Sequence, residues 1–162
     1  MFFGMSSFTV TRSIETPASA ADVRALVDDV RRWSSWSPWE RGNGRGEARR
    51  DVGGPEFGEG AHCAWGGGAA TEGNAMVVHS APGVVEVRLV ITGPYRLNVP
   101  LQFSFDALES GTLVTCSASG EVHGFGSALA ARRLSRRLGR DLVRALAHLA
   151  HAAATVPSVR VP

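Results

Sequence analysis

The sequence contains no lysine, so all 17 of its basic residues are arginine. Alanine, glycine and valine are abundant as well, and we therefore attribute the absence of lysine to the composition of the whole chain. Acidic residues balance the arginines to a formal net charge of +2. Nucleic-acid-binding proteins usually carry a larger basic excess, so we expect no nucleic-acid partner.

Cysteine is scarce, because Cys63 and Cys116 are the only two in the chain. Two cysteines do not make a disulfide framework, and we expect buried, reduced thiols in a cytoplasmic protein. With His62, His79 and His123 they invite comparison with a metal site, but the paired spacing of metal ligands is missing. We expect no metal and no cofactor.

Long apolar runs are missing too. No segment approaches the roughly 18 consecutive apolar residues of a membrane-spanning helix. The apolar start, Met1–Met5, is far too short for a signal peptide and lacks a basic segment. We therefore expect no stable membrane insertion. A length of 162 residues with 44% hydrophobic and 20% charged residues is typical of one soluble domain, which we place at residues 8–154.

What the chain does contain is a series of alternating stretches that predict strands. Apolar residues occupy every second position from Val99 to Phe105, as in a half-buried strand. Turn signals such as Pro82-Gly83 and Gly93-Pro94 separate the stretches, and turns this short require antiparallel pairing. The predicted strands are Phe8–Glu15, a short one near Glu47–Val52, Ala61–Trp65, Glu72–Ser80, Val84–Thr92, Val99–Asp106 and Leu113–Val122.

Two short helices are expected after the first strand. Ser19 stands where a hydroxyl can accept a hydrogen bond from a free N–H of the first helical turn. Apolar residues follow at helical spacing from Val23 to Val30, and Trp33 and Trp36 continue the pattern. Pro38 disfavours further helix.

The last third of the chain predicts one long amphipathic helix, from about Ser127 to Ala154. Its apolar arc consists of Leu134, Leu138, Leu142, Ala145, Leu146, Leu149, Ala152 and Ala153, and its basic arc of Arg132, Arg133, Arg136, Arg137, Arg140 and Arg144. A helix this long must cover one face of the sheet, which makes the fold class α+β. The basic arc either contacts membrane headgroups or nucleic acid or, more simply, is solvated. Gly139, at the edge of the apolar arc, either admits a close neighbour or a ligand, or is merely tolerated.

This order of elements, with particular motifs, resembles the SRPBCC superfamily (START-like and birch-pollen-allergen-like proteins) and, within it, the bacterial polyketide cyclase/dehydrase-type family. The motifs are Thr16-Pro17-Ala18 with Asp22-Val23, Val30 with the tryptophan-rich segment 33–39, Gly58-Glu59-Gly60 with Trp65, Ala81-Pro82-Gly83, Gly111–Thr115, and Gly139-Arg140-Asp141-Leu142 with Leu146 and Leu149. Together these motifs extend the resemblance from about Phe8 to Ala153. The resemblance implies a helix-grip fold, in which a curved antiparallel sheet wraps around the long C-terminal helix.

The resemblance also implies a cavity between the sheet and the last helix, of the kind that holds apolar or amphipathic small molecules. We expect a tryptophan of the second short helix, the inward face of the strands and the apolar arc of the long helix to line it. The predicted ligand-binding residues are Trp33, Met76, Val78, Val87, Leu89, Leu101, Phe103, Val114, Cys116, Leu138 and Leu142.

Catalytic candidates are few. Aromatase/cyclases of this superfamily are expected to carry a cavity-facing arginine on the strand before the Pro turn, and the equivalent position here is Ser80. A serine supplies no fixed cation to stabilise an enolate. The neighbouring His79 could act as a general base but is more simply a solvent-facing strand residue. Arg88 and Arg96 are alternative sources of charge, and surface positions are the simpler interpretation of both.

Three functions remain open from the sequence. The first is a carrier or binding protein for a hydrophobic small molecule, lipid- or polyketide-like. The second is a polyketide cyclase/aromatase-like enzyme acting in the same cavity, which requires converging polar groups. The third is a protein-interaction module with a filled interior. The oligomeric state stays open.

Overall fold

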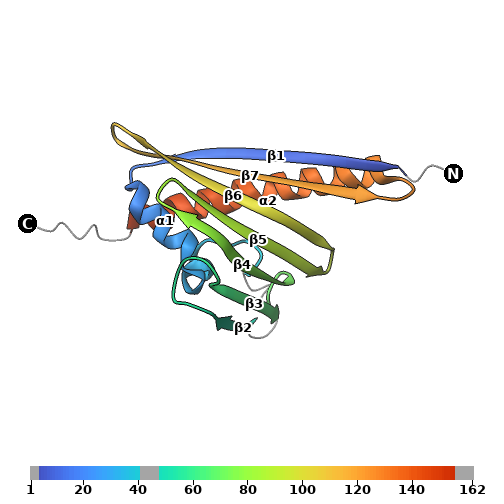
Figure 1. The fold of residues 1–162 in the computed structure, drawn as a ribbon, viewed down its shortest axis with the longest axis horizontal. Helices are drawn as coiled ribbons and strands as arrows, with labels where there is room; N and C mark the ends of the chain where they lie inside the picture. Colours follow the sequence, from blue (N-terminus) through green and yellow to red (C-terminus); the bar gives the residue numbers. More distant parts are fainter. Residues whose placement is uncertain (1–3, 41–47, 156–162) are drawn as a thin grey trace, which may run out of the picture.

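The computed structural model describes residues 4–40 and 48–155, which form one curved sheet and a long C-terminal helix (Figure 1). The strands are β1 (Met5–Thr16), β2 (Ala48–Gly53), β3 (His62–Gly67), β4 (Glu72–Ala81), β5 (Val84–Gly93), β6 (Leu97–Leu108) and β7 (Gly111–His123). They lie in the order β1-β7-β6-β5-β4-β3-β2, and every neighbouring pair is antiparallel. The predicted α+β fold is confirmed, including the short second strand, although Glu47 lies outside the described residues.

The helices are α1 (Ala20–Asp28), the 3₁₀ helix η1 (Val30–Ser35) and α2 (Ser127–Thr155). The hydroxyl of Ser19 accepts a 3.2 Å hydrogen bond from the backbone N–H of Asp22, as expected for a helix cap. Among the described residues, no helix is both long enough and apolar enough to cross a membrane.

Helix α2 runs along β1 and β7 on the inward face of the sheet, while the other strands curve away below it (Figure 1). The predicted arcs are confirmed, because Leu138, Leu142, Leu146 and Leu149 are buried and the arginines are exposed. Helices α1 and η1 lie near the C-terminal half of α2 and close that end of the space between helix and sheet (Figure 1).

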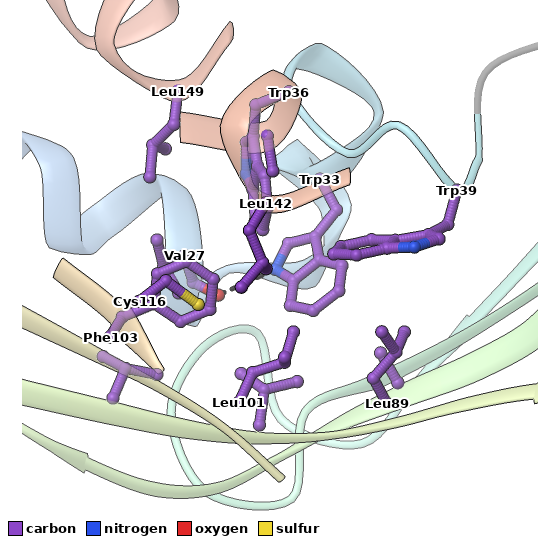
Figure 2. Packing of buried hydrophobic residues seen from close by; sticks show 14 of the residues in the cluster. Val27, Trp33, Trp36, Trp39, Leu89, Leu101, Phe103, Cys116, Leu142 and Leu149 are labelled. Atoms are coloured by element: carbon purple, nitrogen blue, oxygen red, sulfur yellow. Dashed lines mark hydrogen bonds between the residues drawn. The ribbon is translucent and has the colours of Figure 1, made fainter. Parts of the chain in front are cut away.

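Tryptophan side chains fill the centre of the molecule (Figure 2). The ring centroids of Trp33 and Trp36 lie 4.8 Å apart. Trp36 packs edge-on against Phe103, with their ring centroids 5.8 Å apart. Both indole N–H groups donate to carbonyls at the end of α1, Trp33 to Val27 at 2.7 Å and Trp36 to Leu26 at 2.8 Å. Carbonyls at a helix end have no partner within the helix, so the tryptophans satisfy them while packing the core.

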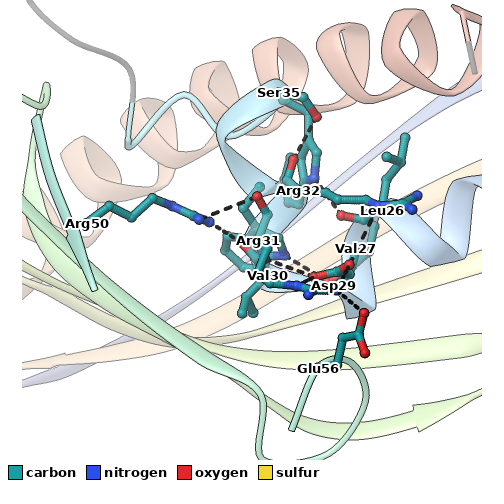
Figure 3. Close-up of polar contacts among 11 residues, drawn as sticks. Leu26, Val27, Asp29, Val30, Arg31, Arg32, Ser35, Arg50 and Glu56 are labelled. Carbon is teal, nitrogen blue, oxygen red and sulfur yellow. Dashed lines mark hydrogen bonds and ion pairs between the residues drawn. The ribbon is translucent and has the colours of Figure 1, made fainter. Parts of the chain in front are cut away.

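Charged groups attach the β2 edge of the sheet to η1 (Figure 3). Asp29 accepts hydrogen bonds from the backbone and the guanidinium of Arg31, and Arg31 also pairs with Glu56 at 2.7 Å. From β2, Arg50 donates to the carbonyls of Val30 and Arg31 and pairs with the buried Glu40. These contacts connect β2 to the short helices.

One strand faces the opposite way from our prediction. In β4, Ala75 and Val77 point inward, whereas Met76 and Val78 are 42% and 44% exposed on the outer face. The expected inward orientation of Met76 and Val78 is therefore wrong. A shift of one residue exchanges the two faces of a strand, and three successive apolar residues at 76–78 gave no alternation to fix the choice.

Candidate functional site

The centre of the predicted cavity is packed with side chains. Nine of the predicted ligand-binding residues are buried in this core: Trp33, Val87, Leu89, Leu101, Phe103, Val114, Cys116, Leu138 and Leu142. Their inward orientation is confirmed, and Figure 2 shows several of them converging on the tryptophans. None of the nine lines any of five hollows of about 230 to 610 Å³ among the described residues. Their contact with a ligand stays a prediction.

A hollow opens instead beside α2, at the stretch where β6 and β7 are not paired. A groove of about 420 Å³ lies there, with walls from β1, β5, β6, β7 and α2. Its apolar side chains are Phe8, Val90, Ile91, Leu97, Val99 and Leu134, and its polar lining is Thr92, Arg96, Asn98 and Glu121. An apolar hollow with a few polar groups at its edge is the usual form of a small-molecule site.

Gly120 helps to shape this groove. It stands opposite Phe8 in the β1–β7 pair, and a Cβ at this position would lie 2.7 Å from the Phe8 ring and 3.1 Å from Val99. The absence of a side chain therefore lets the aromatic ring of the edge strand lie across the glycine and form one wall.

A polar cluster beside the groove joins the β5–β6 turn to α2. The hydroxyl of Tyr95 donates to Asp141, and the guanidinium of Arg137 lies over the Tyr95 ring. Burial, reinforced by the Asp141 carboxylate, raises the pKa of Tyr95 to about 12, so the phenol keeps its proton at neutral pH. Burial also raises the pKa of Asp141, against the opposing effects of Tyr95, Trp39 and the neighbouring arginines.

The two catalytic candidates lie away from the groove. His79 is exposed and its Nδ1 lies 3.2 Å from Glu59. Ser80 is half-buried, accepts a 3.0 Å hydrogen bond from Arg24 and donates at 3.3 Å to Asp28. Burial raises the pKa of Asp28, although Arg24 and Ser80 oppose the shift. A catalytic role for His79 or Ser80 stays a prediction.

Of the two alternative cations, one belongs to the groove. Arg96 contributes to the groove lining, whereas Arg88 points away from the core and donates to Asn98 at 3.1 Å. No group of three or more His, Cys, Asp or Glu side chains that could hold a metal ion occurs within residues 4–40 and 48–155.

Apart from Arg96, weighed as a source of charge, and Leu134, in the apolar arc of the long helix, the groove residues were missed by sequence reasoning, although the signal for several of them was present. Ile91 follows Leu89 by two positions, and Val99 precedes Leu101 by two. Continuing the inward alternation to the strand ends would have included both. The sequence pattern does not distinguish a packed strand centre from an open strand end, because that depends on where the tryptophans lie.

Solved structures of similar fold include two aromatase/cyclases and Ara h 8.0201. The Zhui aromatase/cyclase from Streptomyces sp. R1128 is 15% identical, with a TM-score of 0.66 over 91% of this chain and 94% of its own. The di-domain aromatase/cyclase BexL from the BE-7585A biosynthetic pathway is 16% identical, also at 0.66, and the match covers 93% of this chain and 51% of BexL. Ara h 8.0201 is 10% identical, at 0.66, over 93% of this chain and all of its own (100%).

At these identities the structural matches establish the fold. No curated protein matches the sequence. The model of one family, described as polyketide cyclase / dehydrase and lipid transport, matches residues 7–154, which is nearly the whole chain. The curved sheet, the long closing helix and this match agree with the resemblance seen in the sequence motifs, and the chain therefore belongs to the polyketide cyclase / dehydrase and lipid transport family.

Proposed function

We propose that this protein binds a hydrophobic or amphipathic small molecule, lipid- or polyketide-like, and holds it between the sheet and α2 as a carrier or binding protein. The observation that carries the proposal is the groove of about 420 Å³ with apolar walls from five elements. Its volume lies in the range of about 300–1,000 Å³ typical of small-molecule sites.

The distribution of polar groups supports an amphipathic ligand. The deeper walls are the buried side chains of Ile91, Leu97 and Val99, while Arg96 and Glu121 are exposed at the edge. An apolar chain or ring would be removed from water against the walls, at about 25 cal/mol per Å² of apolar surface. A polar end of the ligand would meet the charged edge.

A matched pair of leucine variants on α2 tests this site. Leu134→Gln places a polar amide in the groove wall, and Leu129→Gln makes the same change at an exposed leucine outside the groove. The probe is N-phenyl-1-naphthylamine, which is uncharged and gains fluorescence in apolar surroundings. We expect saturable binding to the wild type and to Leu129→Gln, and binding at least several-fold weaker to Leu134→Gln.

No binding by the wild type, or equal weakening in both variants, would contradict the proposed site. Native mass spectrometry of the protein purified from its own host then identifies the natural ligand as a co-purified mass. A protein that carries no small molecule and does not bind the probe would favour the third function, an interaction module, which agrees with the packed tryptophan centre.

The hydrogen bonds of Ser80 favour cyclase/aromatase activity as a second candidate. Arg24, Asp28 and Ser80 converge from α1 and β4, and Arg24 and Asp28 border a hollow of about 350 Å³. A carboxyl with a raised pKa and a guanidinium are suited to moving a proton and stabilising an enolate. The test supplies a poly-β-ketone thioester and monitors its cyclisation by the absorbance of the aromatic product. The cyclisation rate should be lower in both Ser80→Ala and Asp28→Asn. If the wild type does not turn over this substrate, the cyclase/aromatase candidate is excluded.

A further inference from the structure

A row of arginines on α2 meets another arginine from β1 around a second hollow. Arg136, Arg140 and Arg144 follow one another at intervals of four residues, so about 6 Å separates successive members along the helix axis. Arg12 reaches them from the edge strand. The hollow has a volume of about 610 Å³ and is lined by Arg12, Arg136, Gly139, Arg140, Val143 and Arg144. It shares no lining residue with the apolar groove.

Gly139 explains how Arg12 comes so close to the helix. A Cβ on this glycine would lie 2.6 Å from Nη2 of Arg12, so the guanidinium lies directly against the helix backbone. Nη1 of Arg12 donates to the carbonyl of Thr11 at 2.8 Å. The close neighbour that the sequence suggested for Gly139 is therefore a guanidinium from β1.

The arginines of this hollow have no close carboxylate partner among the described residues. Within residues 4–40 and 48–155, none of its four arginines forms an ion pair with a carboxylate. Four other arginines in the same ranges do have a carboxylate partner: Arg24, Arg31, Arg32 and Arg50. Asp141, the only acid of α2, accepts a hydrogen bond from Tyr95, and its charge also acts on Arg144 without forming a close ion pair.

Like charges one helical turn apart repel one another, so an anion bound among them would relieve an unfavourable arrangement. The planar guanidinium donates paired hydrogen bonds that match the oxygens of a phosphate group. Several such groups around a concave surface suit a compact, multiply charged anion better than a single carboxylate.

We propose that the hollow formed by Arg12, Arg136, Arg140 and Arg144 binds the phosphate or diphosphate group of a phosphorylated small molecule. This site is separate from the apolar groove, and its failure leaves the proposed hydrophobic ligand untouched. The same phosphate chemistry is available from a lipid headgroup, and the experiment distinguishes the two sources.

The test uses pyrophosphate as the probe and sodium chloride at equal ionic strength as the reference. Calorimetric titration measures affinity, and the thermal unfolding midpoint measures stabilisation. The variant Arg136→Gln/Arg140→Gln removes two charges from the hollow. Arg132→Gln/Arg133→Gln removes two exposed charges from the same helix outside the lining, so both proteins have the same net charge.

We expect pyrophosphate to bind and stabilise the wild type and the control variant, with at least tenfold weaker binding to Arg136→Gln/Arg140→Gln. Gly139→Ala is a second variant, which keeps every charge but displaces the Arg12 guanidinium, and it should weaken binding several-fold. Equal losses in both double variants, or no preference for pyrophosphate over chloride, would overturn the proposal. Binding to phosphatidylglycerol vesicles without binding of free pyrophosphate would also overturn it, in favour of a membrane surface.

Discussion

The phenol of Tyr95 donates a 3.2 Å hydrogen bond to Oδ2 of Asp141, which joins the β5–β6 turn to the middle of α2. The guanidinium of Arg137 lies 4.0 Å from the centre of the Tyr95 ring and adds a second contact. Arg96 and Leu97 follow Tyr95 directly, and both line the apolar groove. The position of the groove wall formed by Arg96 and Leu97 therefore depends on the contacts that Asp141 and Arg137 of α2 make with Tyr95.

Tyr95→Phe should lower the free energy of unfolding by about 1 kcal/mol, because it removes one hydrogen bond and keeps the ring beneath Arg137. Urea unfolding at neutral pH measures the loss. In an Asp141→Ala background the same substitution has no acceptor to lose, so its effect should become much smaller. An undiminished loss in that background would show that the hydroxyl acts through another contact.

Asp141→Asn should change how stability depends on pH. Burial raises the pKa of Asp141 above its ordinary value of 3.8, so the folded protein holds this proton more firmly than the unfolded chain does. The tighter proton binding stabilises the folded wild type at low pH, and this stabilisation is lost as the pH rises from about 4 through the raised pKa. Asparagine has no proton to lose, so the variant shows no such change. We expect the difference in unfolding free energy, variant minus wild type, to increase as the pH rises across that window. A constant or falling difference in urea unfolding series would contradict the assignment.

Trp33→Phe should destabilise the protein by about 2–4 kcal/mol, because it leaves space in the core and removes the donor to the Val27 carbonyl. Met76→Ala, on the outer face of β4, is the control and should remain within about 0.5 kcal/mol of wild type. Urea unfolding followed by circular dichroism measures both. A large loss in Met76→Ala would mean that β4 faces the other way.

The two thiols should be unreactive in the folded protein. Cys63 and Cys116 are free and buried. Burial raises the pKa of Cys63 to about 12 and raises that of Cys116 as well, so little thiolate forms near neutral pH. Ellman's reagent should modify neither at mildly alkaline pH until urea unfolds the chain, when both react. Rapid labelling of the native protein would show that one of these sites opens.

The fold was predictable where local pattern and packing agree. Strands β5, β6 and β7 alternate clearly, so the inward orientation of Leu89, Leu101 and Cys116 follows from the sequence. In β4 the run Met76–Val78 is apolar without alternation, and a register shift between Val77 and His79 adds to the ambiguity.

The candidate site was predictable only in part, because it depends on distant contacts. The tryptophans fill the centre of the expected cavity, and no local pattern shows how deep they reach. Arg24 lies 56 positions from Ser80, so their hydrogen bond leaves no trace in either segment. The hollow around Arg12 likewise requires β1 and α2 to be side by side, which only the fold establishes.

The pairing of β1 with β7 has a consequence for how the protein is made. Thr11 and Ser117 are hydrogen-bonded across this pair although 106 positions separate them, and α2 then packs over both strands. Strand β1 leaves the ribosome before the other strands of this sheet, yet it is among the last to find its partners. Strands β4 to β7, joined by short turns, can pair during synthesis, whereas closure by β1 and α2 requires almost the complete chain. Synthesis that stops short of α2 leaves in water the part of the inner face that α2 covers, chiefly along β1 and β7.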